Sequence, residues 1–233
     1  MAIPDQELTA IRLVVFDLDG TLVDSKLDLA HSVNAVRKDM GLEPLPLDLI
    51  ASYVGQGVTV LIERALGELA TEENVKKGLA FFLSYYREHM LDNTRPYPGV
   101  REALENLRGR TLAVLTNKPV RFSREMLERL ALAPHFVAIY GGNSFPRKKP
   151  DPFGLRKIMG DLKVSPPETL IVGDSDTDVL TGRNAGVWTC GVTYGFGAHS
   201  LESAPPDLLL ANLRQLPALL DGRTQVGGSG TSH

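Results

Sequence analysis

Short apolar runs recur along this chain, and polar segments containing glycine or proline separate them. Six of these runs predict β-strands, at residues 13–16, 112–115, 137–140, 170–172, 188–192 and 208–210. Between them, apolar residues recur three or four positions apart, as in Val100/Leu104/Leu107, which predicts helices. Alternating strands and helices are typical of an α/β fold, here a doubly wound parallel sheet.

Residues 24–95 have a different character. They carry no strand signal, and their apolar positions fall at helical spacing, as in Leu29/Val33/Val36/Met40. We therefore expect an all-helical domain at 24–95, inserted into a core formed by 1–23 and 96–220. Prolines and a glycine at 96–99 mark the second border, and an aromatic stripe at 81–86 is interpreted as helix packing. The polar, glycine-rich segment 221–233 predicts a disordered tail.

Composition narrows the class of protein. The chain has 233 residues and 43% hydrophobic content, enough for a substantial core, and its net charge of −3 gives no basic footprint for nucleic acid. Its one cysteine, Cys190, cannot form an internal disulfide, and its apolar neighbours predict burial. No apolar run approaches the roughly 18 residues of a membrane span. These features favour a cytoplasmic protein without a membrane partner. The sequence leaves the oligomeric state open between a monomer and a homodimer.

The first predicted strand ends in Asp17-Leu18-Asp19-Gly20-Thr21. Residues two apart on an extended segment point to the same side, so Asp17 and Asp19 can face one ligand while Gly20 lets the chain turn away. Acidic turns after buried strands are common, and this motif alone is equally consistent with a surface turn.

Three further polar motifs follow later strands: Thr116-Asn117-Lys118, Lys148-Lys149-Pro150, and the segment from Gly173 to Asp178. Each taken alone is consistent with a helix cap or a solvated loop. In an open parallel sheet, however, ligands bind at the carboxyl ends of the strands, where all four motifs would meet. Their joint occurrence in this order predicts one catalytic site.

These motifs resemble those of the haloacid dehalogenase superfamily of phosphatases. The segment from Asp17 to Ser25 is similar to the first motif of that superfamily, Thr116 to its second, Lys149 to its third, and Gly173 to Asp178 to its fourth. Within it, the chain looks like the phosphoglycolate phosphatase branch, in its Thr116–Pro119, Val54–Gly57 and Gly191–Gly195 segments. Asn143 departs from the aspartate that this branch often carries.

The resemblance implies a Rossmann-like core with a helical cap and a Mg²⁺-dependent mechanism. Asp17 would attack phosphorus to form an aspartyl-phosphate, and Asp19 would donate and accept protons. A carboxylate oxygen of Asp17, the backbone carbonyl of Asp19 and Asp174 would hold Mg²⁺, with Asp178 in the outer shell. The phosphoryl oxygens would be bound by Thr116, Asn117 and Lys149.

A helical cap over the strand ends predicts a small phosphorylated metabolite as substrate, 2-phosphoglycolate first. Its carboxylate would need a cation, and four cap residues are candidates: Lys26, Arg37, Lys38 and Arg64. Solvated helix faces explain these four charges equally well. A sugar-phosphate phosphatase or a β-phosphoglucomutase-like phosphomutase would keep the same core motifs. A dehalogenase needs neither the proton-handling Asp19 nor a metal. From another class, a phospho-accepting signalling module also uses a strand-end aspartate with threonine and lysine.

Overall fold

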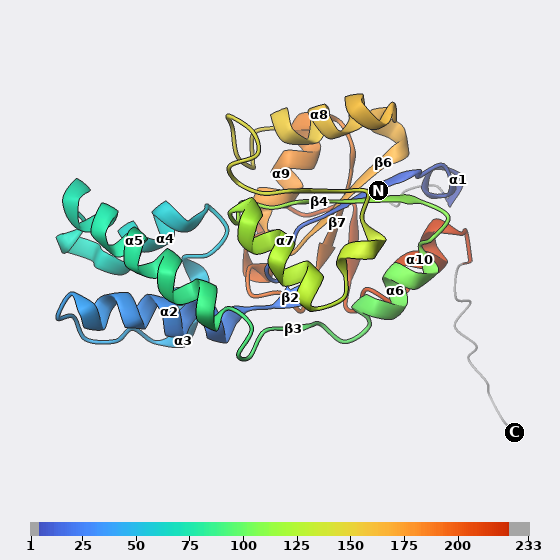
Figure 1. Ribbon diagram of the computed structural model, residues 1–233. Helices are drawn as coiled ribbons and strands as arrows, with labels where there is room; N and C mark the ends of the chain where they lie inside the picture. Colours follow the sequence, from blue (N-terminus) through green and yellow to red (C-terminus); the bar gives the residue numbers. More distant parts are fainter. Residues whose placement is uncertain (1–4, 224–233) are drawn as a thin grey trace, which may run out of the picture.

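The computed structural model describes residues 5–223, and the sheet predicted from the sequence is confirmed (Figure 1). Its six strands are β1 (Leu13–Phe16), β4 (Thr111–Leu115), β5 (Ala138–Tyr140), β6 (Thr169–Gly173), β7 (Trp188–Val192) and β8 (Leu208–Leu210). All neighbouring strands pair in parallel, in the order β5-β4-β1-β6-β7-β8. Phe16, the last residue of β1, lies opposite Val114 of β4 and Val172 of β6. The strand order reverses at β1, and a ligand site is expected beyond its carboxyl end.

Helices cover both faces of the sheet. They are α1 (Asp5–Thr9), α6 (Val100–Asn106), α7 (Val120–Arg129), α8 (Phe153–Leu162), α9 (Asp176–Ala185) and α10 (Gln215–Leu220), with short 3-10 turns at η2 (Ala133–His135), η3 (Pro166–Glu168) and η4 (Ala198–Glu202). Alternate residues of β1 point to opposite faces of the sheet. Leu13 and Val15 pack with residues of α8, whereas Val14 and Phe16 join the larger cluster with α6, α7 and α10. Buried on both sides, β1 is apolar throughout, as parallel strands usually are.

Four helices lie between β1 and α6 in sequence and to one side of the sheet in Figure 1. They are α2 (Lys26–Asp39), α3 (Leu47–Ser52), α4 (Val58–Leu66) and α5 (Glu72–His89), with the 3-10 turn η1 (Gly67–Leu69). The chain enters and leaves this helical group through an antiparallel pair, β2 (Val23–Asp24) and β3 (Arg95–Pro96). This pair was not predicted, because two residues are too short to show a strand period.

The buried carboxylate of Asp28 connects the segment that enters the helical group with the segment that leaves it. Asp28, in the first turn of α2, accepts hydrogen bonds from Asn93 N, Asn93 Nδ2, Thr94 N and Thr94 Oγ1 at 2.7–3.0 Å. Burial alone would raise the pKa of Asp28, but the bonds from Asn93 and Thr94 outweigh it and lower that pKa. The start of α2 and the segment before β3 are therefore held as one unit.

Two smaller expectations concern Cys190 and the tail. Cys190 is buried in β7, as expected. Asp221, at the start of the predicted disordered tail, instead forms an ion pair with Arg110 at 3.0 Å, while residues 224–233 lie outside the described residues. No helix within 5–223 combines the length and apolarity that crossing a membrane requires.

Candidate active site

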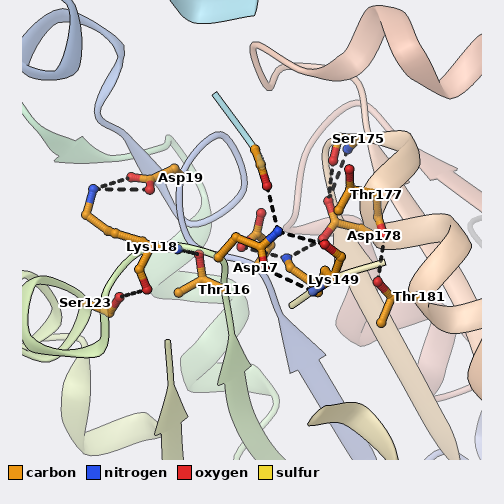
Figure 2. Close-up of polar contacts among 12 residues, drawn as sticks. Asp17, Asp19, Thr116, Lys118, Ser123, Lys149, Ser175, Thr177, Asp178 and Thr181 are labelled. Atoms are coloured by element: carbon orange, nitrogen blue, oxygen red, sulfur yellow. Dashed lines mark hydrogen bonds and ion pairs between the residues drawn. The ribbon is translucent and has the colours of Figure 1, made fainter. Parts of the chain in front are cut away.

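Lys149 lies between two carboxylates at the carboxyl ends of β1 and β6. Its Nζ is 2.9 Å from Asp17 Oδ1 and 2.6 Å from Asp178 Oδ1 (Figure 2). All three side chains are buried, so these ion pairs form in a region of low dielectric constant. Burial alone would lower the pKa of Lys149, but Asp17 and Asp178 outweigh it and raise that pKa. The lysine is a fixed positive charge beside Asp17.

The turn from β6 into α9 explains the position of Asp178. Ser175 caps the helix in a reciprocal capping box, and both Ser175 N and Ser175 Oγ donate to Asp178 Oδ2, at 3.2 and 2.8 Å. Because Lys149 takes the other oxygen, both carboxylate oxygens of Asp178 have protein partners. Asp178 therefore holds Lys149 and the turn in place.

Asp174 completes a cluster of carboxylates that fits a divalent cation. Asp17, Asp174 and Asp178 each offer an oxygen, and these oxygens all lie within 4.8 Å of one another. Burial raises the pKa of Asp17 to about 6. The positive charge of Lys149 opposes this rise, and the negative charge of Asp178 adds to it. Burial, together with Asp178 and Asp17, raises the pKa of Asp174 well above its ordinary value. A buried group of oxygen ligands that repel one another is chemically suited to Mg²⁺.

Gly20 leaves the space in which the Asp174 carboxylate lies. Its φ is +83°, and a Cβ there would stand 2.1 Å from Asp174 Oδ2. Both facts exclude a side chain at residue 20. Gly197 N donates to the same oxygen at 2.7 Å, so Asp174 is fixed from the β7 side as well.

Asp19 lies apart from this cluster and faces a second lysine. Lys118 Nζ is 3.0 Å from Asp19 Oδ1 and 3.1 Å from Oδ2, and Ser25 Oγ donates to Oδ1 at 2.6 Å. Lys118 also donates to the hydroxyl of Tyr86 on α5, at 2.6 Å (Figure 2 shows the pair of Lys118 and Asp19). Asp19 is thus oriented by one residue from the start of α2 and one from the end of β4.

Thr116 and Asn117 lie beside Asp17 but differ in what their side chains can do. The buried Thr116 hydroxyl accepts a bond from Lys118 N at 3.3 Å and keeps its proton to donate. The Asn117 amide donates to Gly55 O and Lys149 O, at 2.8 and 3.0 Å, and accepts from Lys149 N at 3.0 Å. With both side-chain donors used, any bond from Asn117 to a phosphoryl oxygen would come from its main-chain N–H.

One cavity joins these residues to the helical group. Asp17, Asp19, Thr116 and Asp174 line its floor, and its walls come from α2, the loop before α4, α4, α5 and the start of α7. Phe82 and Tyr86 are buried in the hydrophobic core, as the interpretation of the aromatic stripe as helix packing expects, and they also line this cavity. Phe82 also stacks on Tyr86, with ring centroids 5.2 Å apart.

The structure brings the residues predicted from the sequence to this one place. It adds Lys118, Ser25 and Tyr86, to which the sequence analysis assigns no individual role. The four candidate cap cations do not line the cavity in the described part of the chain. Lys26 pairs with Asp48, Arg64 donates to Gln56, Arg37 donates to backbone carbonyls, and Lys38 is exposed.

Comparison with known proteins agrees with this geometry. The sequence profile described as haloacid dehalogenase-like hydrolase matches residues 14–192, most of the chain. The chain belongs to the haloacid dehalogenase-like hydrolase family. It is therefore an enzyme, and a phospho-accepting signalling module is set aside.

Its relatives in this family point to a narrower group. A phosphoglycolate phosphatase from Chromobacterium violaceum is 40% identical over 219 residues, covering 91% of this chain and 98% of that protein. One from Neisseria meningitidis is 38% identical over 216 residues, covering 88% and 92%. A crystal structure titled a predicted phosphoglycolate phosphatase, from Haemophilus somnus, has a TM-score of 0.85 at 34% identity and covers 89% of this chain and 96% of its own. The similarity extends across both the sheet and the helical group.

Proposed function

We propose that this hydrolase cleaves a small phosphate monoester, 2-phosphoglycolate first, to the free alcohol and phosphate, with Mg²⁺ as cofactor. The observation that supports this proposal most directly is the position of Lys149 between Asp17 and Asp178, next to the Asp174 carboxylate. Relatives named phosphoglycolate phosphatase at 38–40% identity support the choice of substrate.

The chemistry starts at Asp17. A carboxylate oxygen of Asp17 attacks phosphorus, the bond from phosphorus to the ester oxygen breaks, and Asp19 gives its proton to the departing alkoxide. Water then attacks phosphorus of the aspartyl-phosphate while Asp19 takes a proton, which releases phosphate and restores Asp17. Lys149 and the Thr116 hydroxyl would stabilise the charge on the phosphoryl oxygens during both steps.

The carboxylates of Asp17 and Asp174, with the backbone carbonyl of Asp19, would hold Mg²⁺. When bound, the ion offsets the charge of the phosphate dianion and of the acidic cluster. Asp178 stays outside this ligand set because Lys149 and Ser175 occupy its oxygens.

Residues 24–95 act in this proposal as a cap over the strand ends. Their helices supply the walls of the cavity, and closure would exclude bulk water from the aspartyl-phosphate. A cavity formed between the cap and the sheet suits a small metabolite better than a folded phosphoprotein.

The test is phosphate release from a panel of small esters with Mg²⁺, including 2-phosphoglycolate and hexose phosphates. We expect release that stops on chelation and is lost in Asp174→Asn. The matched control is Asp176→Asn, which removes a charge from the same motif outside the carboxylate cluster and should stay active. Failure to release phosphate from any ester would overturn the proposal, and isomerised sugar phosphate without release would identify a phosphomutase.

A further inference from the structure

Lys118 is the one basic side chain that lines the cavity within the described residues, and the helical cap supplies none. Its side chain is 4% exposed. A buried ammonium is unfavourable unless it is paired, and Lys118 is held by Asp19 and by the Tyr86 hydroxyl. A lysine ammonium has three N–H donors, and here they face Asp19 Oδ1, Asp19 Oδ2 and the Tyr86 hydroxyl. Two of these contacts go to the same carboxylate, so Lys118 can give one donor to a ligand and still keep its pair with Asp19.

The position of Asp19 places the leaving group next to this lysine. For Asp19 to protonate the ester oxygen, that oxygen must come within hydrogen-bond distance of its carboxyl group. Lys118 Nζ lies 3.0 Å from the same carboxyl group. The atoms of the substrate beyond the ester oxygen therefore approach Lys118 and Tyr86.

The rest of the wall there is apolar. Leu29, Leu61, Phe82 and Phe122 line the cavity beside Lys118 and Tyr86. Such a wall offers few partners for the hydroxyl groups of a sugar, whereas one ammonium and one phenol hydroxyl suit a single compact anion.

We propose that Lys118 binds a carboxylate on the leaving alcohol and so selects short phosphate esters that carry a second anionic group. This inference rests on the proposed phosphatase function and gives it a specificity residue. The carboxylate takes the Lys118 donor that otherwise contacts the second oxygen of Asp19, and the Tyr86 hydroxyl donates to the same anion. Specificity thus comes from the end of β4 and from α5, in place of the surface cations of the cap.

The experiment compares kcat/KM for 2-phosphoglycolate with kcat/KM for ethyl phosphate, which has two carbons and no carboxylate, with Mg²⁺ present. Wild type should favour 2-phosphoglycolate. In Lys118→Met this ratio should fall roughly 10- to 100-fold, the value of a lost charged hydrogen bond. Lys118→Arg keeps the charge and should retain part of the ratio. Lys38→Gln, which removes an exposed cap charge, should leave the ratio unchanged.

Several results would overturn the inference. If Lys118 only orients Asp19, Lys118→Met slows both substrates alike and the ratio stays. A wild type that cleaves ethyl phosphate as well as 2-phosphoglycolate would contradict the inference without any variant, and would leave the phosphatase function standing. A wild type that cleaves no ester of the wider panel removes the proposed function itself.

Discussion

The side-chain amide of Asn117 joins Gly55 of the helical cap to the backbone of Lys149, with Nδ2 2.8 Å from Gly55 O and 3.0 Å from Lys149 O. Its Oδ1 also accepts from Lys149 N. One residue at the end of β4 therefore links the docked cap to the lysine that neutralises Asp17. In the proposed mechanism, this link would couple the position of the cap to the charge beside Asp17.

Asn117→Asp should break that link while keeping the shape of the side chain. The carboxylate can still accept from Lys149 N, but it loses both donors and faces two carbonyl oxygens. We expect kcat/KM to fall about 10- to 100-fold, from about 1.5–3 kcal/mol of lost and unfavourable contacts. Steady-state kinetics at matched Mg²⁺ measures this. Asn143→Asp is the control, because Asn143 only accepts, from Val120 N at the start of α7, and should stay near wild type.

Ser25→Ala should slow turnover through Asp19. The Ser25 hydroxyl is fully buried and donates to Asp19 Oδ1 at 2.6 Å, so its loss leaves the carboxyl group less well oriented. We expect about a 10-fold lower kcat and a changed pH–rate profile, with a stability cost of about 1 kcal/mol. Ser52→Ala, which removes an exposed hydroxyl bonded to Leu49 O, should change neither. An unaltered kcat and pH profile in Ser25→Ala would show that this bond does not orient the proton donor.

Gly20→Ala and Gly41→Ala separate backbone strain from damage to the acidic cluster. Both residues have positive φ, +83° and +72°, so backbone strain alone should cost each alanine about 1 kcal/mol of stability, and Gly20→Ala should cost more because of its clash with Asp174. Only at Gly20 would the new Cβ meet Asp174, whereas Gly41 has open space. We expect the rise in melting temperature on adding Mg²⁺ to vanish in Gly20→Ala and to persist in Gly41→Ala. An equal rise in both variants would contradict the placement of Asp174 in the metal site.

The Asp28 junction predicts a pH-dependent contribution to stability. The pKa of Asp28 is lowered in the folded state, so its ionised form stabilises the protein above the ordinary value of 3.8. That contribution is lost as pH falls through the lowered pKa. Asp28→Asn should cost about 1–3 kcal/mol at pH 7 in chemical denaturation, and the difference from wild type should shrink below about pH 4. A difference that stays constant from pH 7 to pH 3 would show that the charge contributes nothing.

Much of this fold follows from the sequence, because each core strand is a largely apolar run and each motif follows a strand. The rule that ligands bind at the carboxyl ends of parallel strands then places Asp17, Thr116, Lys149 and Asp174 together. The sequence could not reveal β2 and β3, since two-residue strands have no period.

The role of Lys118 was also hidden. In the sequence, a lysine that follows a strand looks the same whether it is solvated or buried. Only the position of α5 over the strand ends shows that Tyr86 and Asp19 enclose Lys118. The sequence likewise could not show that the side chains of Lys26 and Arg64 have partners away from the cavity. Their partners Asp48 and Gln56 lie 22 and 8 residues away, at positions that a helical period does not predict.

The central claim is covalent catalysis by Asp17, and the direct measurement is mass spectrometry of the protein quenched in acid during turnover of 2-phosphoglycolate with Mg²⁺. We predict a phosphoryl group on the peptide that contains Asp17, absent in Asp17→Asn together with nearly all activity. An Asp17→Asn variant that hydrolyses the ester at close to the wild-type rate, or a phosphoryl group on a different residue, would contradict the account.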